Sequence, residues 1–537
     1  MSQPDIQEAQ IPEVSVAVDE IPRDGFCVAG SGKAKALFVR TPKGVAAFQA
    51  TCPHYGLPLD AASLCDGRLY CPFHKASFAM TDGRLIDPPA LHGLDRYPVR
   101  QEHGRAIARL EKMKRGTDAV GTLDPSAANT RFLIVGSGAA ATAAATTMRR
   151  RGFVGEILMI GQEADPPYDR PSLSKDFIAG PLPDSAVWLE GQGFYERYGL
   201  SYVEGQAERI DIGSRRVTLA DGRHFEADAL LVATGSRPRM PAIPGVDLAG
   251  VLTLRSLADA RQLARLAAGQ ARLVIVGGGF IAVEASVFLG RRGIAVTILS
   301  AEAAPLADRL GPDVAGAVLR LVESRGVRVE RGARVVALEG QTAVRGVRLD
   351  DGRLLEASHV LMAAGAVPAT DMLVGARLEA DRGVRTDAYL AIGDSVYAAG
   401  DIAAYPDPLD HAPARVEHWR AACQQGMQAG LNMMGHLAPF QKPPFFWSNI
   451  AGQGLDAVGR PAGYERLILK GDPDRQDFIA YYIKGGRAIA ASGMNRKAEL
   501  IAFMHLMETG RLPDPTFLGA ERSLQTLVQP WDGRAAS

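Results

Sequence analysis

The sequence predicts a multidomain protein: a small all-β domain, an α/β region with two doubly wound dinucleotide-binding units, and a C-terminal α+β domain. Residues 12–112 contain short alternating strands separated by Gly, Pro and Asp turns, which is typical of a small all-β domain. From Arg131 an apolar strand, a glycine turn, an Ala-rich helix and a further strand follow one another, and the same unit returns at Arg272. Such a unit occurring twice indicates two parallel sheets, one for each of two nucleotides.

The chain divides into segments of different character, because 537 residues are too many for a single core. The stretch 113–130 is charged, small and turn-prone, and we expect a linker there. We expect the first nucleotide-binding domain at 131–245 and 375–438, and the second at 246–374. Residues 439–537 contain the strands FIAYYIKGG and RAIAASG and the helix KAELIAFMHLMETG, so a separate α+β domain is predicted.

The composition excludes several classes of protein. Lys plus Arg equals Asp plus Glu at 60 each, so neither nucleic acid nor an anionic membrane is an expected bulk partner. The apolar stretches near 132–148 and 273–289 are interrupted by glycines and by Glu284, which argues against a membrane span. The first residues lack the features of a targeting peptide, and five cysteines do not suggest a secreted disulfide framework. We therefore expect a cytoplasmic protein.

The first glycine turn fits a dinucleotide-binding motif. Gly136 permits the tight turn, Gly138 lets the backbone approach a pyrophosphate, and the small Ala141 lets the helix pack on the strand. Glu163, or its neighbour Gln162, stands where a ribose-binding residue is expected. The order of strand, turn, helix and strand supports a nucleotide site here.

The second glycine turn has the same dinucleotide-binding motif, formed by Gly277, Gly279 and Ala282. Two such units need two nucleotides, and a flavin with a nicotinamide is the commonest pair. Ser300 ends the strand where an acidic residue would bind an NAD ribose, and Glu302 comes two places later. No arginine occupies that position to favour a 2′-phosphate, so NADH and NADPH both stay open, with a lean to NADH.

These turns occur with the motifs YDRPSLSK (168–175), LLVATGSRP (230–238) and VYAAGDIA (396–403), and together they resemble the flavoprotein reductases of the glutathione-reductase superfamily. PYDRPSLSK and RVEHWRAACQQG are similar to the ferredoxin reductases that serve oxygenases and to the apoptosis-inducing-factor group. The resemblance covers about residues 130–530. It implies that the first nucleotide-binding domain holds FAD and the second holds NAD(P)H. The residues implied in cofactor binding are Gly136, Gly138, Ala141, Glu163, Arg170, Lys175, Thr234, Gly235, Gly277, Gly279, Ala282, Gly400, Asp401 and Trp447.

The same resemblance implies that Lys175 and Glu284 form a catalytic ion pair beneath the flavin. A lysine there would stabilise negative charge on the reduced ring, and a carboxylate would keep the lysine charged and oriented. The alternatives are a solvated loop lysine for Lys175, a helix-surface acid for Glu284 and a plain core tryptophan for Trp447. The sequence has no cysteine between Cys71 and Cys423, which excludes the thiol–disulfide chemistry of related reductases. A one-electron carrier is therefore the expected acceptor.

A candidate metal site lies in the N-terminal domain, where Cys52-x-His54 is followed by Cys71-x-x-His74. Structural zinc could use such a set, but zinc-finger spacing differs. Pairs of this kind in prolyl loops between strands resemble the Rieske domain, which implies that the four residues bind a [2Fe–2S] cluster. The family usually has CPWHG where this chain has CPFHK, so Phe73 and Lys75 are departures from its pattern.

The remaining residues near this motif have smaller expected roles. The places at which respiratory Rieske proteins carry an extra disulfide are Leu57 and Phe73, so the domain resembles the ferredoxin type. Cys65 is an expected bystander, as are Cys27 and Cys423. Ser77 is the one hydroxyl placed to raise the cluster potential through a hydrogen bond to sulfur.

The expected function is NAD(P)H-dependent electron transfer through FAD to the Rieske cluster and on to an acceptor protein: an oxygenase component, a cytochrome or a ferredoxin. The alternative is an apoptosis-inducing-factor-like redox sensor with incidental NADH oxidation. A Rieske oxygenase would need a mononuclear iron, for which DPLDHAPARVEH (407–418) has the wrong histidine spacing. The oligomeric state, monomer or homodimer, stays open.

Overall fold

The computed structural model describes residues 11–111, 125–180, 182–266 and 268–528. By their internal contacts these residues fall into two compact units. The first unit contains residues 11–111 with the short segments 150–152 and 522–528, and the second contains the remaining described residues. Most of the predicted linker 113–130 lies outside the described residues; its end forms the 3₁₀ helix η2 (Pro125–Asn129).

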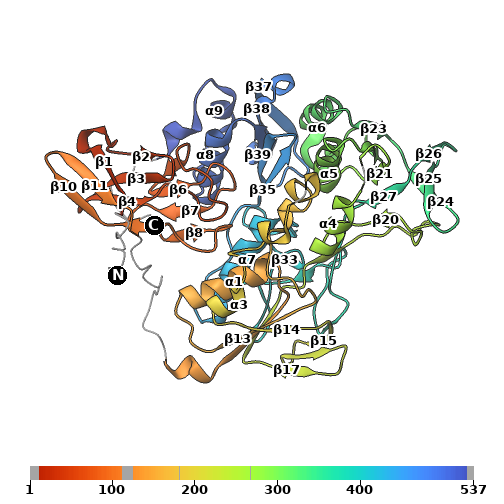
Figure 1. Ribbon diagram of the computed structural model, residues 1–537, viewed down its shortest axis with the longest axis horizontal. Coiled ribbons are helices and arrows are strands. Elements are labelled where there is room, and N and C mark those ends of the chain that lie inside the picture. The colour runs from red at the N-terminus through yellow and green to blue at the C-terminus, as the bar shows by residue number, and fades with distance from the viewer. Residues whose placement is uncertain (1–10, 112–124, 181, 267, 529–537) are drawn as a thin grey trace, which may run out of the picture. The chain divides into compact units, whose positions relative to one another are not determined.

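The first unit is built from three antiparallel sheets, drawn from red to orange in Figure 1. Their orders are β1-β11-β10, β2-β3-β4-β9 and β5-β6-β7-β8. The strands are β1 (Glu13–Ala17), β2 (Phe26–Ser31), β3 (Ala34–Thr41), β4 (Gly44–Gln49), β5 (Ser63–Cys65), β6 (Arg68–Tyr70), β7 (Ser77–Ala79), β8 (Leu85–Asp87), β9 (Arg96–Tyr97), β10 (Val99–Glu102) and β11 (Arg105–Arg109).

Strand β3 joins the two halves of this all-β core. Its side chains alternate between faces, because successive residues of a strand point to opposite sides. Ala36 and Phe38 pack with β1 and β11 in one cluster, whereas Leu37 and Val39 pack in the cluster that contains Cys52 and Cys71. The loops carrying the predicted ligands are thus anchored on one face of the central sheet.

The second unit begins with a six-stranded sheet of order β14-β13-β12-β18-β32-β31, parallel except at the β31 edge. Helix α1 (Ala139–Arg150) connects β12 to β13. The strands are β12 (Arg131–Val135), β13 (Glu156–Gly161), β14 (Ser201–Glu204), β18 (Ala229–Val232), β31 (Ala391–Gly393) and β32 (Val396–Ala398). All of these strands lie in the segments 131–245 and 375–438, where the first nucleotide-binding domain is expected from the sequence.

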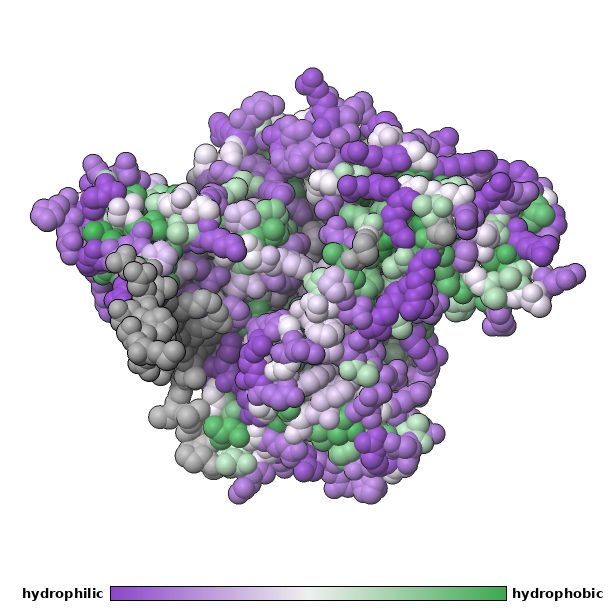
Figure 2. All heavy atoms as spheres, viewed as in Figure 1, coloured by the Kyte–Doolittle hydropathy of each residue, from purple (hydrophilic) through white to green (hydrophobic). Residues whose placement is uncertain are grey.

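A second parallel sheet, of order β20-β27-β21-β22-β23, lies within residues 246–374. Its elements are β20 (Val251–Leu252), α4 (Leu257–Ala264), β21 (Arg272–Val276), α5 (Phe280–Gly290), β22 (Ala295–Ser300), α6 (Ala307–Glu323), β23 (Arg328–Arg331) and β27 (His359–Met362). Beside it is the antiparallel sheet β24 (Val335–Gly340), β25 (Val344–Leu349) and β26 (Leu354–Glu356), whose surface in Figure 2 mixes hydrophilic and hydrophobic residues.

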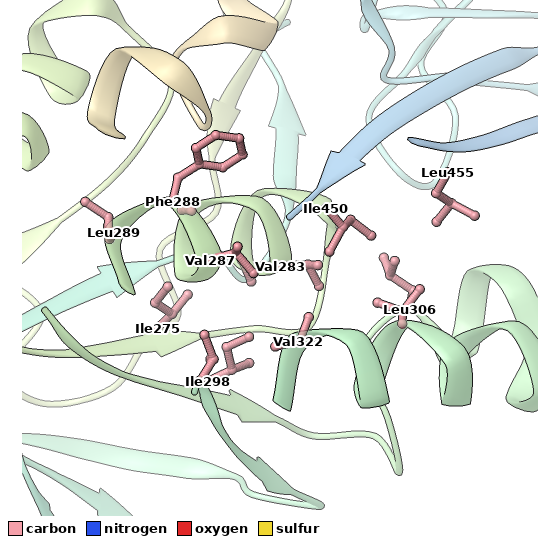
Figure 3. Close-up of a cluster of buried hydrophobic side chains, with 14 of the residues drawn as sticks. Ile275, Val283, Val287, Phe288, Leu289, Ile298, Leu306, Val322, Ile450 and Leu455 are labelled. Carbon is pink, nitrogen blue, oxygen red and sulfur yellow. The ribbon is translucent and has the colours of Figure 1, made fainter. Parts of the chain in front are cut away.

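Helix α5 is apolar on all sides and is enclosed by the core. Figure 3 shows Val283, Val287 and Phe288 on different faces of the helix, with Ile298 and Ile450 nearby. A helix that is hydrophobic all round belongs inside a protein. The one acid on α5, Glu284, is therefore held in a buried position.

The C-terminal domain is an antiparallel sheet of order β35-β36-β39-β38-β37 with helix α8 packed against β36 and β39. Its elements are β35 (Phe445–Ile450), β36 (Gln453–Gly459), β37 (Arg466–Asp472), β38 (Asp477–Lys484), β39 (Arg487–Met494), α8 (Lys497–Glu508) and α9 (Pro515–Gly519). With the two parallel sheets and the all-β first unit, this confirms the predicted fold class. None of the helices in the described ranges has both the length and the apolar character needed to cross a bilayer.

Shorter elements connect these parts. They are α2 (Asp176–Ala179), α3 (Phe194–Arg197), β15 (Ala207–Asp211), β16 (Arg216–Leu219), β17 (His224–Glu226), β19 (Ser236–Pro238), β28 (Ala366–Pro368), β29 (Leu373–Val374), β30 (Val384–Arg385), β33 (Ala403–Pro406), β34 (Pro413–Ala414) and α7 (Trp419–Met433). The other 3₁₀ helices are η1 (Val18–Glu20), η3 (Arg170–Ser172), η4 (Asp184–Ala186), η5 (Pro473–Arg475) and η6 (Leu524–Leu527).

Candidate functional site

A single cavity of about 920 Å³ in the second unit is lined by residues of both glycine turns. This volume is at the upper end of the range for small-molecule sites. Ten of the residues predicted to bind cofactor or to catalyse line it: Gly138, Arg170, Lys175, Gly235, Gly277, Gly279, Glu284, Gly400, Asp401 and Trp447. The structure thus brings together motifs that are far apart in the sequence.

Gly136, Ala141, Thr234 and Ala282 are predicted residues that do not line the cavity, and they serve the backbone turns and the packing of the two nucleotide-binding units. Gly136 has φ +125°, and a Cβ there would lie 2.2 Å from the carbonyl oxygen of Ala233. Gly277 repeats this geometry with φ +124° and the same 2.2 Å approach to Ala363. Only glycine fits such a turn. Ala141 and Ala282 are fully buried, as close packing of helix on strand requires, and Thr234 donates a hydrogen bond to the carbonyl of Ala369.

Lys175 and Glu284 form an ion pair on the cavity wall, with Nζ 2.8 Å from Oε2. Their side chains are 11% and 6% exposed, so neither the solvated lysine nor the helix-surface acid describes them. The hydroxyl of Ser448 donates to Oε1 of Glu284 at 2.7 Å, and that of Ser174 donates to Oε2. Lys175 also donates to the carbonyl of Pro171 at 2.8 Å.

These two serines were missed by the sequence analysis. Ser174 stands inside the motif YDRPSLSK and Ser448 follows Trp447, but they lie 110 and 164 residues from Glu284. No local pattern links residues at such separations. With Lys175 they give each carboxylate oxygen of Glu284 a donor, as a buried charge requires.

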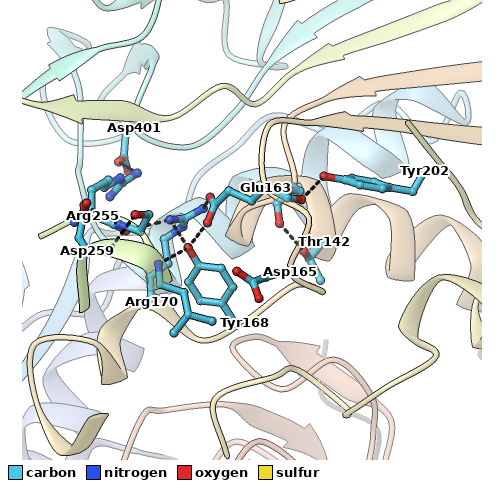
Figure 4. A network of polar contacts seen from close by, with 12 residues as sticks. Thr142, Glu163, Asp165, Tyr168, Arg170, Tyr202, Arg255, Asp259 and Asp401 are labelled. Atoms are coloured by element: carbon cyan, nitrogen blue, oxygen red, sulfur yellow. Dashed lines mark hydrogen bonds and ion pairs between the residues drawn. The ribbon is translucent and has the colours of Figure 1, made fainter. Parts of the chain in front are cut away.

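Asp401 and Arg170 belong to a second polar network, shown in Figure 4. Asp401 accepts hydrogen bonds from the hydroxyl of Ser236 at 2.7 Å and from Arg255 at 2.9 Å. Arg170 donates to the carbonyl of Arg255 at 2.8 Å and pairs with Glu163 at 2.5 Å. The network fixes the carboxylate of Asp401 where it lines the cavity.

Glu163, the predicted ribose contact, has polar partners of its own, and the contact with a ribose stays a prediction. Its carboxylate accepts hydrogen bonds from Arg170 and from the hydroxyl of Tyr168, and it is absent from the cavity wall among the described residues. The guanidinium of Arg170, which itself lines the cavity, neutralises the carboxylate from the inner side. Glu163 therefore orients Arg170.

His418 caps the start of α7 beside Trp447. The main-chain N–H groups of Arg420 and Trp447 each lie 3.3 Å from a ring nitrogen of His418. Burial, together with the nearby charge of Lys175, lowers the pKa of His418 to about 3. The ring is thus neutral at physiological pH and adds no positive charge to the cavity that it lines with Trp447, which is only half-buried and not a plain core residue.

The predicted cluster ligands lie in two loops of the first unit with the same backbone pattern. In the first loop the N–H of Cys52 donates to Leu57 and the carbonyl of Cys52 accepts from Gly56, at 2.7 and 2.8 Å. In the second the N–H of Cys71 donates to Ala76 and its carbonyl accepts from Lys75, at 2.9 and 3.1 Å. The two turns are therefore equivalent, and Gly56 corresponds to Lys75.

The four side chains meet as two pairs. Cys52 and Cys71 are buried and hydrogen-bonded to each other, and this bond lowers the pKa of the Cys71 thiol. Main-chain N–H groups of Phe73 and His74 point at the same sulfur. The half-buried His54 and His74 bring their Nδ1 atoms within 3.2 Å of each other.

This arrangement fits a two-iron cluster, with a thiol pair for one iron and an imidazole pair for the other. Asp407, in the segment weighed for a mononuclear iron, pairs with Arg460 at 3.1 Å. The hydroxyl of Ser77 donates to Asp87 at 3.3 Å, and its bond to a cluster sulfur stays a prediction.

Comparison with known families agrees with this geometry. Residues 130–426, more than half of the chain, match the family described as pyridine nucleotide-disulphide oxidoreductase. The chain belongs to this family. In this oxidoreductase, residues 13–98 also match the Rieske [2Fe-2S] domain and residues 445–528 match the reductase C-terminal family. The cofactors of the oxidoreductase are accordingly FAD, NAD(P)H and a [2Fe–2S] cluster.

Known relatives of the oxidoreductase fall into two groups. Apoptosis-inducing factor 3 of Homo sapiens is 31% identical over 498 residues, which are 89% of this chain and 81% of the relative. The ferredoxin reductase component of chlorobenzene dioxygenase from Cupriavidus sp. (strain PS12) is 32% identical over 76% of this chain and its own full length. Among solved structures, the covalent putidaredoxin reductase–putidaredoxin complex matches 73% of this chain and 96% of its own, with a TM-score of 0.69 and 28% identity.

Proposed function

We propose that the protein is a ferredoxin-reductase-type oxidoreductase that carries electrons from NAD(P)H through FAD to its own Rieske [2Fe–2S] cluster and on to an acceptor protein. The observation that supports it most is the buried Lys175–Glu284 pair on the wall of the cavity that both glycine turns line. The sequence supplies no cysteine between Cys71 and Cys423 for disulfide chemistry, whereas the thiol and imidazole pairs supply a site for a one-electron carrier.

The residues of the cavity act by position and charge. The carboxylate of Glu284 pairs with the ammonium of Lys175 and fixes its position, and the hydroxyls of Ser174 and Ser448 hold that carboxylate in place. A fixed ammonium in a cavity wall that excludes most water stabilises negative charge beside it much more than it would in bulk water. No side chain is required to transfer a proton, so we assign Lys175 and Glu284 an electrostatic role.

The acceptor belongs to the class named in the relatives. One relative is the reductase component of a dioxygenase, and one solved structure is a reductase bound to its redox partner. We propose an oxygenase component, a cytochrome or a ferredoxin as the acceptor, and the cytoplasm as the compartment, since all five cysteines are free thiols.

An anaerobic titration of the purified full-length protein with NADH, and then with NADPH, tests the proposal. Visible absorption reports the flavin, and low-temperature EPR reports the reduced cluster. We expect the flavin to bleach and a Rieske signal to appear in the same titration. A flavin that bleaches without any cluster signal would show that electrons do not pass within the chain.

The match to apoptosis-inducing factor 3 covers more of this chain than the match to the dioxygenase component, which favours a redox sensor as the second candidate. A sensor should form a long-lived complex of reduced flavin with oxidised nicotinamide and pass electrons on slowly. An enzyme should turn over repeatedly when an artificial one-electron acceptor is added. Steady-state turnover with excess NADH separates the two.

The coenzyme preference depends on the end of β22. Ser300 and Glu302 both line the cavity, and the carboxylate of Glu302 accepts a hydrogen bond from the N–H of Asp308 at 2.9 Å. A carboxylate there repels a 2′-phosphate, in favour of NADH. The structure also brings Arg309 and Arg334 to the cavity wall, which the sequence analysis did not foresee.

We expect Glu302→Ala to raise the ratio of kcat/KM for NADPH to that for NADH by about tenfold, or 1.4 kcal/mol. Steady-state kinetics with both coenzymes measures the ratio. The matched control is Glu323→Gln, which removes an exposed carboxylate at the far end of α6. An unchanged ratio in Glu302→Ala would show that Arg309 and Arg334, rather than Glu302, determine the preference.

A further inference from the structure

The two ligand loops differ at one equivalent position. Gly56 and Lys75 each donate a main-chain hydrogen bond to the ligand cysteine four residues earlier, and both have left-handed backbones, with φ +67° and +60°. Glycine adopts this conformation freely, and a Cβ at Gly56 would meet no atom within 4 Å. The second loop therefore carries a lysine at a backbone position that favours glycine.

The side chain of Lys75 carries its ammonium into the interior of the first unit. It is fully buried, and its ammonium donates to the carbonyls of Pro72 and Phe73 at 3.1 and 3.4 Å. Both carbonyls belong to the loop between Cys71 and His74. A strained backbone and a buried charge at the same residue point to a function.

We infer that the Lys75 ammonium raises the reduction potential of the Rieske cluster by placing a fixed positive charge beside the Cys71–His74 loop. The inference rests on the proposed function, in which these loops hold a [2Fe–2S] cluster. Reduction adds one electron, and so one negative charge, to the cluster without making or breaking a bond. A nearby cation stabilises the reduced state more than the oxidised state, since the potential depends on the net charge and hydrogen bonding around the cluster.

Lys75 does not bind iron in this account; it is a positioning and tuning residue. Hydrogen bonds to the carbonyls of Pro72 and Phe73 help to fix where the charge lies. A neutral side chain removes the charge, and an arginine keeps it. A cluster with a higher potential accepts electrons from the flavin more readily. The substitution of lysine for glycine in this loop thereby favours electron flow toward the cluster.

The test is a mediated redox titration of the full-length protein with dithionite, with EPR of the reduced cluster as the readout. The variants are Lys75→Met, Lys75→Gly and Lys75→Arg. The matched control is Lys43→Met, which removes an exposed lysine from the hairpin between β3 and β4. At the potential that half-reduces the wild-type cluster, we expect the reduced-to-oxidised ratio to fall at least tenfold in the two neutral variants, equivalent to about 59 mV for one electron. Lys75→Arg and Lys43→Met should stay within threefold of the wild type.

The outcomes of this redox titration either support or overturn the role inferred for Lys75. A fall of less than tenfold in both neutral variants would overturn the inference while leaving the proposed function intact. Loss of the cluster from both neutral variants would also overturn it, because Lys75 would then hold the loop rather than set the potential. If only Lys75→Met loses the cluster, Lys75→Gly supplies the measurement, as glycine suits the backbone there. Absence of any Rieske signal in the wild type would instead refute the proposed function.

Discussion

His74→Ala is expected to abolish the [2Fe–2S] signal while leaving the flavin bound and reducible by NADH. The imidazole of His74 lies 3.2 Å from that of His54, and removing it leaves one imidazole for an iron that needs two. The flavin is expected in the second unit, whose glycine turns and ion pair the substitution does not touch. Transfer to a protein acceptor should then fall to background.

Absorption and EPR spectra of the purified variant measure both groups in one sample. Cys65→Ser is the matched control, because Cys65 is a buried cysteine between the two loops that is not an expected ligand. It should keep the full Rieske spectrum. A cluster that survives in His74→Ala, or that disappears in Cys65→Ser, would contradict the ligand assignment.

The sequence predicted local features well because their chemistry is local. The glycine turns at Gly136 and Gly277, and the paired Cys-x-His and Cys-x-x-His motifs, each need only a few neighbouring residues. These patterns were enough for the fold class, and the cofactors followed from the family resemblances that the patterns carry. The pairing of Lys175 with Glu284 came from a family resemblance, since the two residues stand on segments with no shared periodicity.

Contacts between distant residues could not be predicted in the same way. Glu163 stands at the expected strand end, yet Arg170 and Tyr168 engage its carboxylate. Arg309 and Arg334 reach the cavity only because α6 and the segment after β23 fold beside β22. The correspondence of Lys75 with Gly56 is visible only in the hydrogen bonds of the two loops. Each of these depends on three-dimensional packing.

Glu284→Gln is expected to lower both stability and the rate of flavin reduction. The substitution leaves Lys175 charged on the cavity wall with the carbonyl of Pro171 as an acceptor. Removing one partner of a buried pair costs about 3–5 kcal/mol. Lys175→Met should lower the free energy of unfolding by less, because the carboxylate of Glu284 keeps the hydroxyl donors of Ser174 and Ser448. Lys175→Met should reduce flavin about a hundredfold more slowly, as loss of a preorganised charge does elsewhere. Glu284→Gln should also slow flavin reduction, because the remaining ammonium loses the carboxylate that fixes its position.

The double variant Lys175→Met/Glu284→Gln separates stability from electron transfer. It leaves no uncompensated charge, so its midpoint of urea denaturation should return toward the wild-type value. Its flavin reduction, measured by stopped-flow absorption with NADH, should stay slow because the ammonium is still missing. The exposed pair Asp221–Arg223 is the control, and Asp221→Asn should leave the midpoint of urea denaturation unchanged. If the double variant reduces flavin at the wild-type rate, the pair is structural, and the electrostatic role assigned to Lys175 is wrong.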